Sequence, residues 1–342
     1  MHGPQRTIAA LACASIEPAT LSTYSTPIRK FQRWLQSRDA PKFACSEDLV
    51  CQYILYLHAE KCSYDSFKPV KAAITLYALC LGKDVGTIFT ETLSKCFKGG
   101  LKLAWNDKAP TFKVPELELS FVKKLYFDFV HPFKDNIFDS DGRKFRCIFM
   151  MILEFCLLAR CHDLQRLRAG DVTMTFDTTH GETAIFRFRH RKNDSQGTTT
   201  SLVLPNLQED FNPVFITKLF FRRFNLRFGQ DKDFHDVPLF HRFTCSKLLN
   251  SVNYRPSDKE VCSNTILKDM RKQLSAIQYP GAEKVCHNSL RCGGVTQAFE
   301  KGLDEGNIRD IGGWHNSNTP LRYRRKNIRD KTKNVIKMLS QK

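Results

Sequence analysis

The sequence predicts a mainly α-helical protein with one small antiparallel β-sheet, divided into two domains. First, apolar residues recur at helical spacing through most of the chain. Second, NDKAPTFKVPE at 106–116 carries two prolines and no helical periodicity, which is typical of an interdomain linker. Third, AIFRFRHR (184–191) and TTTSLVLP (198–205) alternate apolar and polar residues on either side of a turn that contains Asn, Asp, Ser and Gly. We therefore expect a leader at 1–18, an all-α domain at 19–106, a linker at 107–116 and a second domain at 117–342.

Helical patterns account for the whole N-terminal domain. The first helix opens at 20–22, and Tyr24, Ile28, Phe31 and Leu35 form its apolar face. The remaining three helices are predicted at 46–58, 64–82 and about 87–105. Basic residues on the last of these, including Lys98 and Lys102, can follow a DNA backbone, although a lysine series is often only a solvated face.

The second domain begins with two helices and continues through the sheet to a helical C-terminal part. The first helix lies near 116–129, and the second is capped at Ser140-Asp141 and ends at Arg160 as a core helix. The predicted sheet follows, formed from RLRAGDVTM and the two alternating segments. Later helices are predicted at about 213–228, 264–277, 287–302, 304–312, 318–325 and 327–340.

Composition restricts the partners of the chain. Lys and Arg total 53 against 35 Asp and Glu, a net charge of +18 with a pI near 9.4, which favours nucleic acid over a membrane surface. The alternative is a merely soluble basic protein. The 13 cysteines include no CxxC pair, which indicates reduced thiols and neither a disulfide framework nor a zinc site. Without a signal-peptide pattern or a run of transmembrane length, we expect an intracellular protein, nuclear if eukaryotic.

Three residue types near the C-terminus are suited to attack on a phosphodiester. Arg291, Trp314 and Tyr323 follow one another at offsets of 23 and 9 residues. An arginine stabilises phosphoryl charge, an indole N–H donates one hydrogen bond, and a tyrosine oxygen attacks. Taken singly, each has a plainer interpretation as a solvated charge, a core residue or a surface residue, so the hypothesis depends on the three together.

This C-terminal motif resembles that of the tyrosine recombinases, the family of phage integrases, Xer-type resolvases and Cre-like recombinases. Their motif runs His-x-x-Arg, then Gly-(His/Trp), then the nucleophilic tyrosine nine residues later, and Gly313-Trp314 and Tyr323 fit this spacing. The small residues of SLRCGG after the arginine resemble recombinases of eukaryotic mobile elements.

An upstream block extends the resemblance over roughly 15–340. In LLARCHDLQRLRAGDV, Arg160 takes the place of the first catalytic arginine of the family, and Asp163 that of the carboxylate that braces it. FRFRHRKNDSQGTTTSLVL is similar to the β-hairpin with the catalytic lysine, which is best placed at Lys192. A basic strand edge that only touches phosphates is the alternative for this hairpin.

The chain departs from the family pattern at the histidine. Three residues before Arg291 stands Asn288, and His287 lies one residue further upstream. A helix turns about 100° per residue, so a shift of one place moves a side chain off the site. Either Asn288 replaces the histidine as a donor, or His287 reaches the phosphate from a loosened helix start. Asn is no useful base near neutral pH, so the first option weakens the enzyme.

The resemblance implies cleavage and rejoining of double-stranded DNA through a 3′-phosphotyrosyl intermediate, without metal, ATP or another cofactor. Tyr323 is then the nucleophile, Lys192 the general acid, and Arg160 and Arg291 the phosphate clamp. The family also implies a homotetramer on DNA that is monomeric in solution. The alternatives are an inactive DNA-binding descendant and a type IB topoisomerase. The residues expected to contact DNA outside the catalytic set are Arg187, Arg189, Arg191, Lys98 and Lys102.

Overall fold

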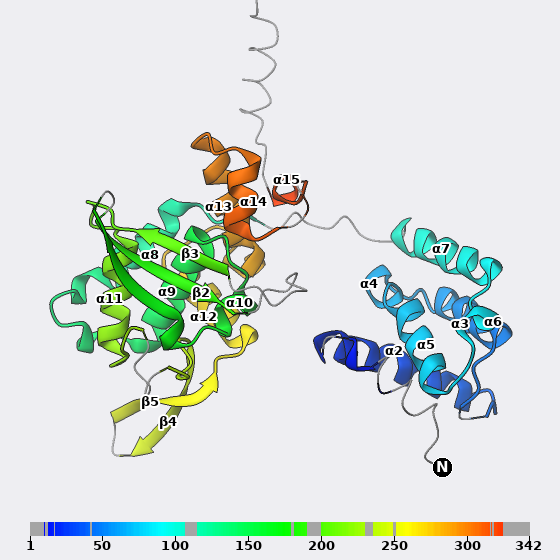
Figure 1. Ribbon diagram of the computed structural model, residues 1–342. Helices are drawn as coiled ribbons and strands as arrows, with labels where there is room; N and C mark the ends of the chain where they lie inside the picture. Colours follow the sequence, from blue (N-terminus) through cyan, green and yellow to red (C-terminus); the bar gives the residue numbers. More distant parts are fainter. Residues whose placement is uncertain are drawn as a thin grey trace, which may run out of the picture. The chain divides into compact units, whose positions relative to one another are not determined.

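The computed structural model divides the chain into two compact units, Met1–Phe112 and Lys113–Lys342 (Figure 1). It describes residues 10, 13–16, 18–41, 43–106, 115–178, 181–189, 200–229, 235–248, 251–314, 316 and 318–323. The side chains of 19, 177, 244–248 and 251–258 are not among those described. Most of the expected leader and linker, together with Arg191, Lys192 and the helix expected at 327–340, lies outside the described residues. Each unit is considered by itself.

The N-terminal unit is all-α in its described part, as predicted. Its helices are α2 (Pro18–Gln36), α3 (Glu47–Ala59), α4 (Tyr64–Phe67), α5 (Val70–Cys80), α6 (Val85–Ile88) and α7 (Glu91–Asn106). The Ser46 side chain caps α3 by accepting from the Leu49 N–H. The core is strongly aromatic, because the rings of Phe31, Trp34 and Tyr53 pack against one another.

Two predicted helices of this unit are each divided in two. The helix expected at 64–82 breaks ahead of α5, where Pro69 has no backbone N–H to donate. The helix expected from residue 87 begins only at Glu91, after the Thr90 hydroxyl accepts from the Leu93 N–H. Pro69 in the first case and the Thr90 cap in the second therefore decide where a helix begins, although the apolar periodicity continues across both positions.

The second unit is built around one buried helix. Its helices are α8 (Leu119–Phe129), α9 (Gly142–Cys156), α10 (Cys161–Gln165), α11 (Pro213–Arg223), α12 (Ser263–Ala276), α13 (His287–Glu300), α14 (Glu305–Gly312) and α15 (Thr319–Tyr323). Asp141 caps α9 by accepting from the Arg143 and Lys144 N–H groups. The predicted core helix is confirmed, since α9 is buried over most of its length and packs against α8, α10, α11, α12 and α13.

The predicted small antiparallel sheet is also present. Its three strands lie in the order β1 (Val172–Asp177), β2 (Gly181–Phe188) and β3 (Thr200–Pro205). Phe186 pairs with Val172 on one side and with Leu202 on the other, so buried apolar residues are in register across all three strands. Helix α11 packs against β2 and β3 (Figure 1).

A second antiparallel hairpin was not predicted. Strands β4 (His241–Leu248) and β5 (Ser251–Glu260) form a separate two-stranded sheet. Their sequence, HRFTCSKL and SVNYRPSDKE, is polar, contains a proline and shows little alternation, so backbone pairing and not side-chain pattern defines these strands. No helix in the described part of the chain is long and apolar enough to cross a membrane.

Candidate active site

Arg160 stands at the junction between two helices of the second unit. After α9 ends, Leu158 takes a left-handed conformation with φ 47°, and Arg160 then occupies the extended position that starts α10. Its guanidinium Nη1 lies 3.7 Å from Oδ2 of Asp163, whose side chain is buried. The local fold thus fixes a half-buried arginine beside a buried carboxylate.

Arg291, Trp314 and Tyr323 lie together in a second cluster. The Cζ atom of Arg291 is 4.1 Å from the centroid of the Trp314 ring and 5.3 Å from that of the Tyr323 ring. The two aromatic centroids are themselves 5.3 Å apart. Arg291 is only 1% exposed, and its Nη2 donates to the Gly312 carbonyl at 2.6 Å. A cation, an indole and a phenol therefore form one cluster.

Two glycines explain how the chain reaches this arrangement. Gly313 ends α14 with φ 61° and ψ 50°, a left-handed conformation that favours glycine. At Gly312 a Cβ atom would lie 1.9 Å from Cζ3 of Trp314, so any side chain would displace the indole. Trp314 is 5% exposed, and its Nε1 is buried without a hydrogen-bond partner in the described part of the chain. This N–H can therefore donate a hydrogen bond to a bound ligand.

His287 and Asn288 face different surroundings at the start of α13. The ring nitrogens of His287 lie 3.0 Å from Oε1 of Glu154 and 3.2 Å from the Ser263 carbonyl, so both are engaged with the protein interior. Asn288 is exposed. Burial disfavours the imidazolium, but the hydrogen bond and charge of Glu154 outweigh it and raise the pKa of His287.

Glu154 and Cys161 connect the segments that carry the two arginines. A sulfur of Cys161, a carboxylate oxygen of Glu154 and a ring nitrogen of His287 all lie within 4.8 Å of one another. Cys161 follows Arg160 directly, and His287 precedes Arg291 by about one helical turn. The beginnings of α10 and α13 therefore lie side by side. Sequence reasoning missed Glu154, although a lone charge in the apolar run IFMMILEFCLLA indicates a buried partner.

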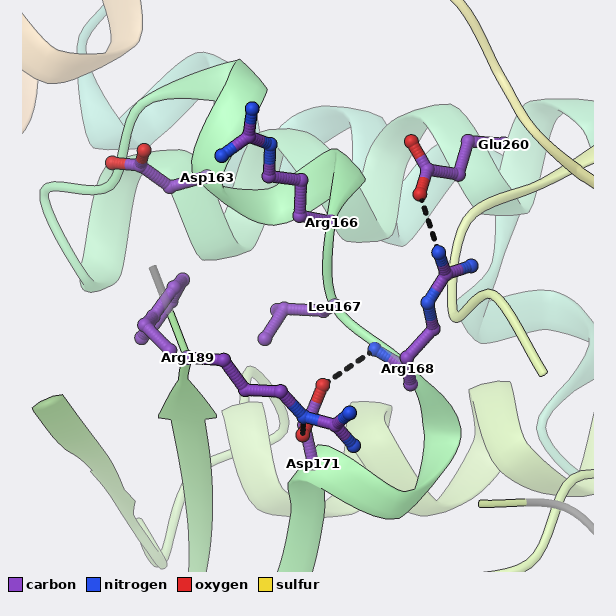
Figure 2. A pocket seen from close by; sticks show the side chains of 8 residues that line it. Asp163, Arg166, Leu167, Arg168, Asp171, Arg189 and Glu260 are labelled. Atoms are coloured by element: carbon purple, nitrogen blue, oxygen red, sulfur yellow. Dashed lines mark hydrogen bonds and ion pairs between the residues drawn. The ribbon is translucent and has the colours of Figure 1, made fainter. Parts of the chain in front are cut away.

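A polar hollow of about 340 Å³ opens next to Asp163 (Figure 2). Asp163 lies at one end and Glu260 at the other, with Arg166 along one wall. Its remaining lining residues are Leu167, Arg168, Asp171, Phe188 and Arg189. Arg189, from just beyond β2, donates through Nε to Asp171 at 2.6 Å, and Arg168 donates to Glu260 at 2.8 Å. These carboxylates hold the arginines in place at the edge of the site.

The other residues expected to contact DNA lie on separate elements of the two units. Arg187 is exposed near the end of β2, and Lys98 and Lys102 are exposed on α7 of the N-terminal unit. Arg191 and Lys192 are outside the described residues, so the position of the candidate general acid relative to the arginines stays a prediction.

Comparison with known proteins agrees with the architecture. No family model matches the sequence, and no curated protein matches it. Among solved structures, the chain is similar to a XerH site-specific recombinase bound to a palindromic difH substrate in a post-cleavage complex. The TM-score is 0.50 with 13% identity, over 93% of this chain and 78% of that one. A lambda integrase dimer bound to a COC′ core site gives a TM-score of 0.50 with 14% identity, over 95% of this chain and 76% of that one.

The chain, with its all-α N-terminal unit and its mainly helical second unit, thus has the fold of the tyrosine recombinases and integrases. At these identities the similarity concerns the fold, and the function has to be argued from the residues of this chain.

Proposed function

We propose that the protein cleaves and rejoins double-stranded DNA by tyrosine recombinase chemistry. The observation that supports this most is the packing of the Arg291 guanidinium against the rings of Trp314 and Tyr323. A permanently charged guanidinium next to the ring of a tyrosine nucleophile is suited to stabilise the charge of a phosphoryl group that this tyrosine attacks.

In this mechanism the Tyr323 hydroxyl releases its proton to water, and its oxygen attacks the scissile phosphorus and forms a 3′-phosphotyrosyl bond as the bond to the 5′-oxygen breaks. The leaving oxygen takes a proton from Lys192 and departs as a 5′-hydroxyl. A 5′-hydroxyl of a second DNA end then attacks the phosphotyrosine and releases Tyr323. Because the protein–DNA bond conserves the energy of the phosphodiester, the cycle needs no ATP.

The arginines supply the charge stabilisation. Arg160 and Arg291 are permanently charged forks that suit two non-bridging oxygens, and Asp163 orients the first of them. The Trp314 N–H, which is buried without a partner among the described residues, supplies a further donor. Since Arg291 is 1% exposed beneath the aromatic rings, DNA binding has to move the short helix α15 before a phosphate can reach it.

Assembly into a tetramer on DNA is part of the proposal, because exchange joins two cut duplexes. The second unit carries a mostly apolar groove of about 540 Å³ suited to an apolar segment from a neighbouring copy. Its lining includes Leu119, Phe155, Leu158, Leu207, Leu303 and Ile311.

A second candidate is favoured by one observation. His287 is turned into the interior and the exposed Asn288 stands at the position of the family histidine. An inactive DNA-binding descendant would retain the basic surface and tolerate this exchange.

Covalent trapping on DNA tests both candidates. The full-length protein is incubated with nicked duplexes that lose the 5′-hydroxyl strand, and adducts are resolved on denaturing gels. We expect an adduct that Tyr323→Phe abolishes and that Tyr56→Phe, a change in the N-terminal unit, leaves intact. Salt-sensitive DNA binding without any adduct would select the inactive descendant, and an undiminished adduct in Tyr323→Phe would exclude the proposed nucleophile.

A further inference from the structure

Three side chains with metal-binding chemistry meet in the interior of the second unit. Glu154 comes from α9, Cys161 from the start of α10 and His287 from the start of α13. One potential ligand atom from each lies within 4.8 Å of the others. Glu154 is 1% exposed and Cys161 is 7% exposed, so water has little access to the cluster.

The Glu154 carboxylate is incompletely satisfied by the protein. Oε1 lies 3.0 Å from Nδ1 of His287, while Oε2 is buried with no hydrogen-bond partner among the described residues. A buried carboxylate oxygen without a partner is costly, and burial accordingly raises the pKa of Glu154. The carboxylate is therefore placed where a bound cation would stabilise it.

We propose that Glu154, Cys161 and His287 bind one Zn²⁺ ion, which ties together the two segments that carry Arg160 and Arg291. A thiolate, an imidazole and a carboxylate form a mixed donor set that suits zinc better than magnesium or calcium. The charges also balance, since one thiolate and one carboxylate neutralise Zn²⁺ in a low-dielectric interior. The fourth position is taken by water. When Nδ1 of His287 binds the ion, Nε2 can donate to the Ser263 carbonyl, which lies 3.2 Å away, and this hydrogen bond holds the ring in place.

Zinc binding requires only small changes in the distances between the three ligand atoms. Zinc bonds of about 2.0–2.3 Å place tetrahedral ligands about 3.3–3.7 Å apart. The three ligand atoms lie within 4.8 Å of one another, so no pair has to close by more than about 1.5 Å. The pair formed by Oε1 of Glu154 and Nδ1 of His287, now 3.0 Å apart, has to open by a few tenths of an ångström. A rotation of the glutamate and imidazole side chains can supply such a movement without shifting the helices.

Zinc binding at this site has to release protons. Zinc binds the thiolate, the neutral imidazole and the carboxylate, so the ion displaces the thiol proton of Cys161 and any proton held by His287 or Glu154. Zinc affinity is therefore expected to rise with pH. A purely structural hydrogen-bonded cluster would show no such uptake of metal at any pH.

The test uses full-length protein freed of metal with a chelator and titrated with Co²⁺ and then Zn²⁺. We expect one equivalent of Co²⁺ to give a thiolate charge-transfer absorption band that Zn²⁺ bleaches. Glu154→Gln and Cys161→Ser should weaken zinc binding by at least about 100-fold, since the loss of an outer-shell partner alone costs 10–100-fold. Cys262→Ser removes an exposed cysteine outside the cluster and should leave affinity and band unchanged.

A second measurement uses the protein without any substitution, so it tests the proposal even if the variants fail to fold. Zinc should protect Cys161 from alkylation, read out residue by residue by mass spectrometry, more than it protects Cys262. Absence of a band and of protection at micromolar metal, or a band that persists in Cys161→Ser, would overturn the proposal. Neither readout depends on DNA cleavage, so this test and that of the proposed function fail independently.

Discussion

Gly293→Ala is the substitution whose effect the structure specifies most closely. Gly293 lies in α13 two residues after Arg291, where the helix passes the chain that leads into α8. A Cβ atom at this position would lie 1.9 Å from the Leu117 carbonyl oxygen and 3.1 Å from the Phe155 ring. Since ordinary Cβ contacts begin at 3.4 Å, the two backbones have to separate by about 1.5 Å.

Two opposing effects decide the magnitude. Alanine is favoured over glycine in a helix by about 1 kcal/mol. Overpacking costs about 1–3 kcal/mol, and the separation also strains the hydrogen bond from the Leu117 N–H to the Ser289 carbonyl at 3.0 Å, worth about 1 kcal/mol. The net expectation is a destabilisation of the second unit by about 1–3 kcal/mol.

Gly99→Ala is the matched control for this prediction. Gly99 is exposed within α7, and a Cβ atom there meets nothing within 4 Å. The same chemical change should therefore stabilise the N-terminal unit by about 0.5–1 kcal/mol. Urea unfolding, followed separately for the two units by hydrogen exchange, measures both effects. If Gly293→Ala is neutral or stabilising, the close approach of α13 to Leu117 is refuted.

Three further predictions concern the site and the charged surface. Trp314→Phe retains a ring against the guanidinium but removes the buried indole N–H, so single-turnover cleavage should fall by about 10²-fold with DNA binding unchanged. The raised pKa of His287 means that its contribution to stability is complete below pH ~6.5 and is lost as the pH rises through the folded-state pKa. Urea midpoints at a series of pH values, in chelator, should show this fall, and Glu154→Gln should flatten it. Replacing Lys98 and Lys102 together by alanine should lower the salt slope of DNA binding by about 2, and an unchanged slope would remove α7 from the interface.

Local chemistry made most of the fold predictable. Ser46 and Asp141 cap their helices as their positions in the sequence indicated, and the alternating segments form the three-stranded sheet. The errors occur where one residue competes with a pattern, as at Pro69, or where backbone pairing carries a strand with no alternating pattern. The hairpin of β4 and β5 is the clearest case, since the stability of such a ribbon depends on neighbours that the sequence does not show.

The candidate site was predictable only in part, for a different reason. Motif spacing pointed to Arg291, Trp314 and Tyr323, and the structure adds why Gly312 must be glycine. The association of Glu154, Cys161 and His287 depends on three helices that meet in space, and no spacing rule relates residues so far apart in the chain. Only the lone carboxylate within an apolar helix signalled that a partner had to exist.

The one-residue displacement of the histidine has a consequence for the pH dependence of cleavage. His287 has both ring nitrogens engaged in the interior, and Asn288 can donate a hydrogen bond but cannot take a proton from the nucleophile. Without an imidazole base in the pocket, the rate of adduct formation should rise with pH and show no inflection near ~6.5. Asn288→His should introduce such an inflection and raise the rate at neutral pH, while Asn264→His, at the start of α12, serves as a control for an added imidazole. An inflection near neutrality in the natural sequence that disappears in His287→Gln would mean that His287 leaves Glu154 to act on the phosphate, contrary to the arrangement in the structure.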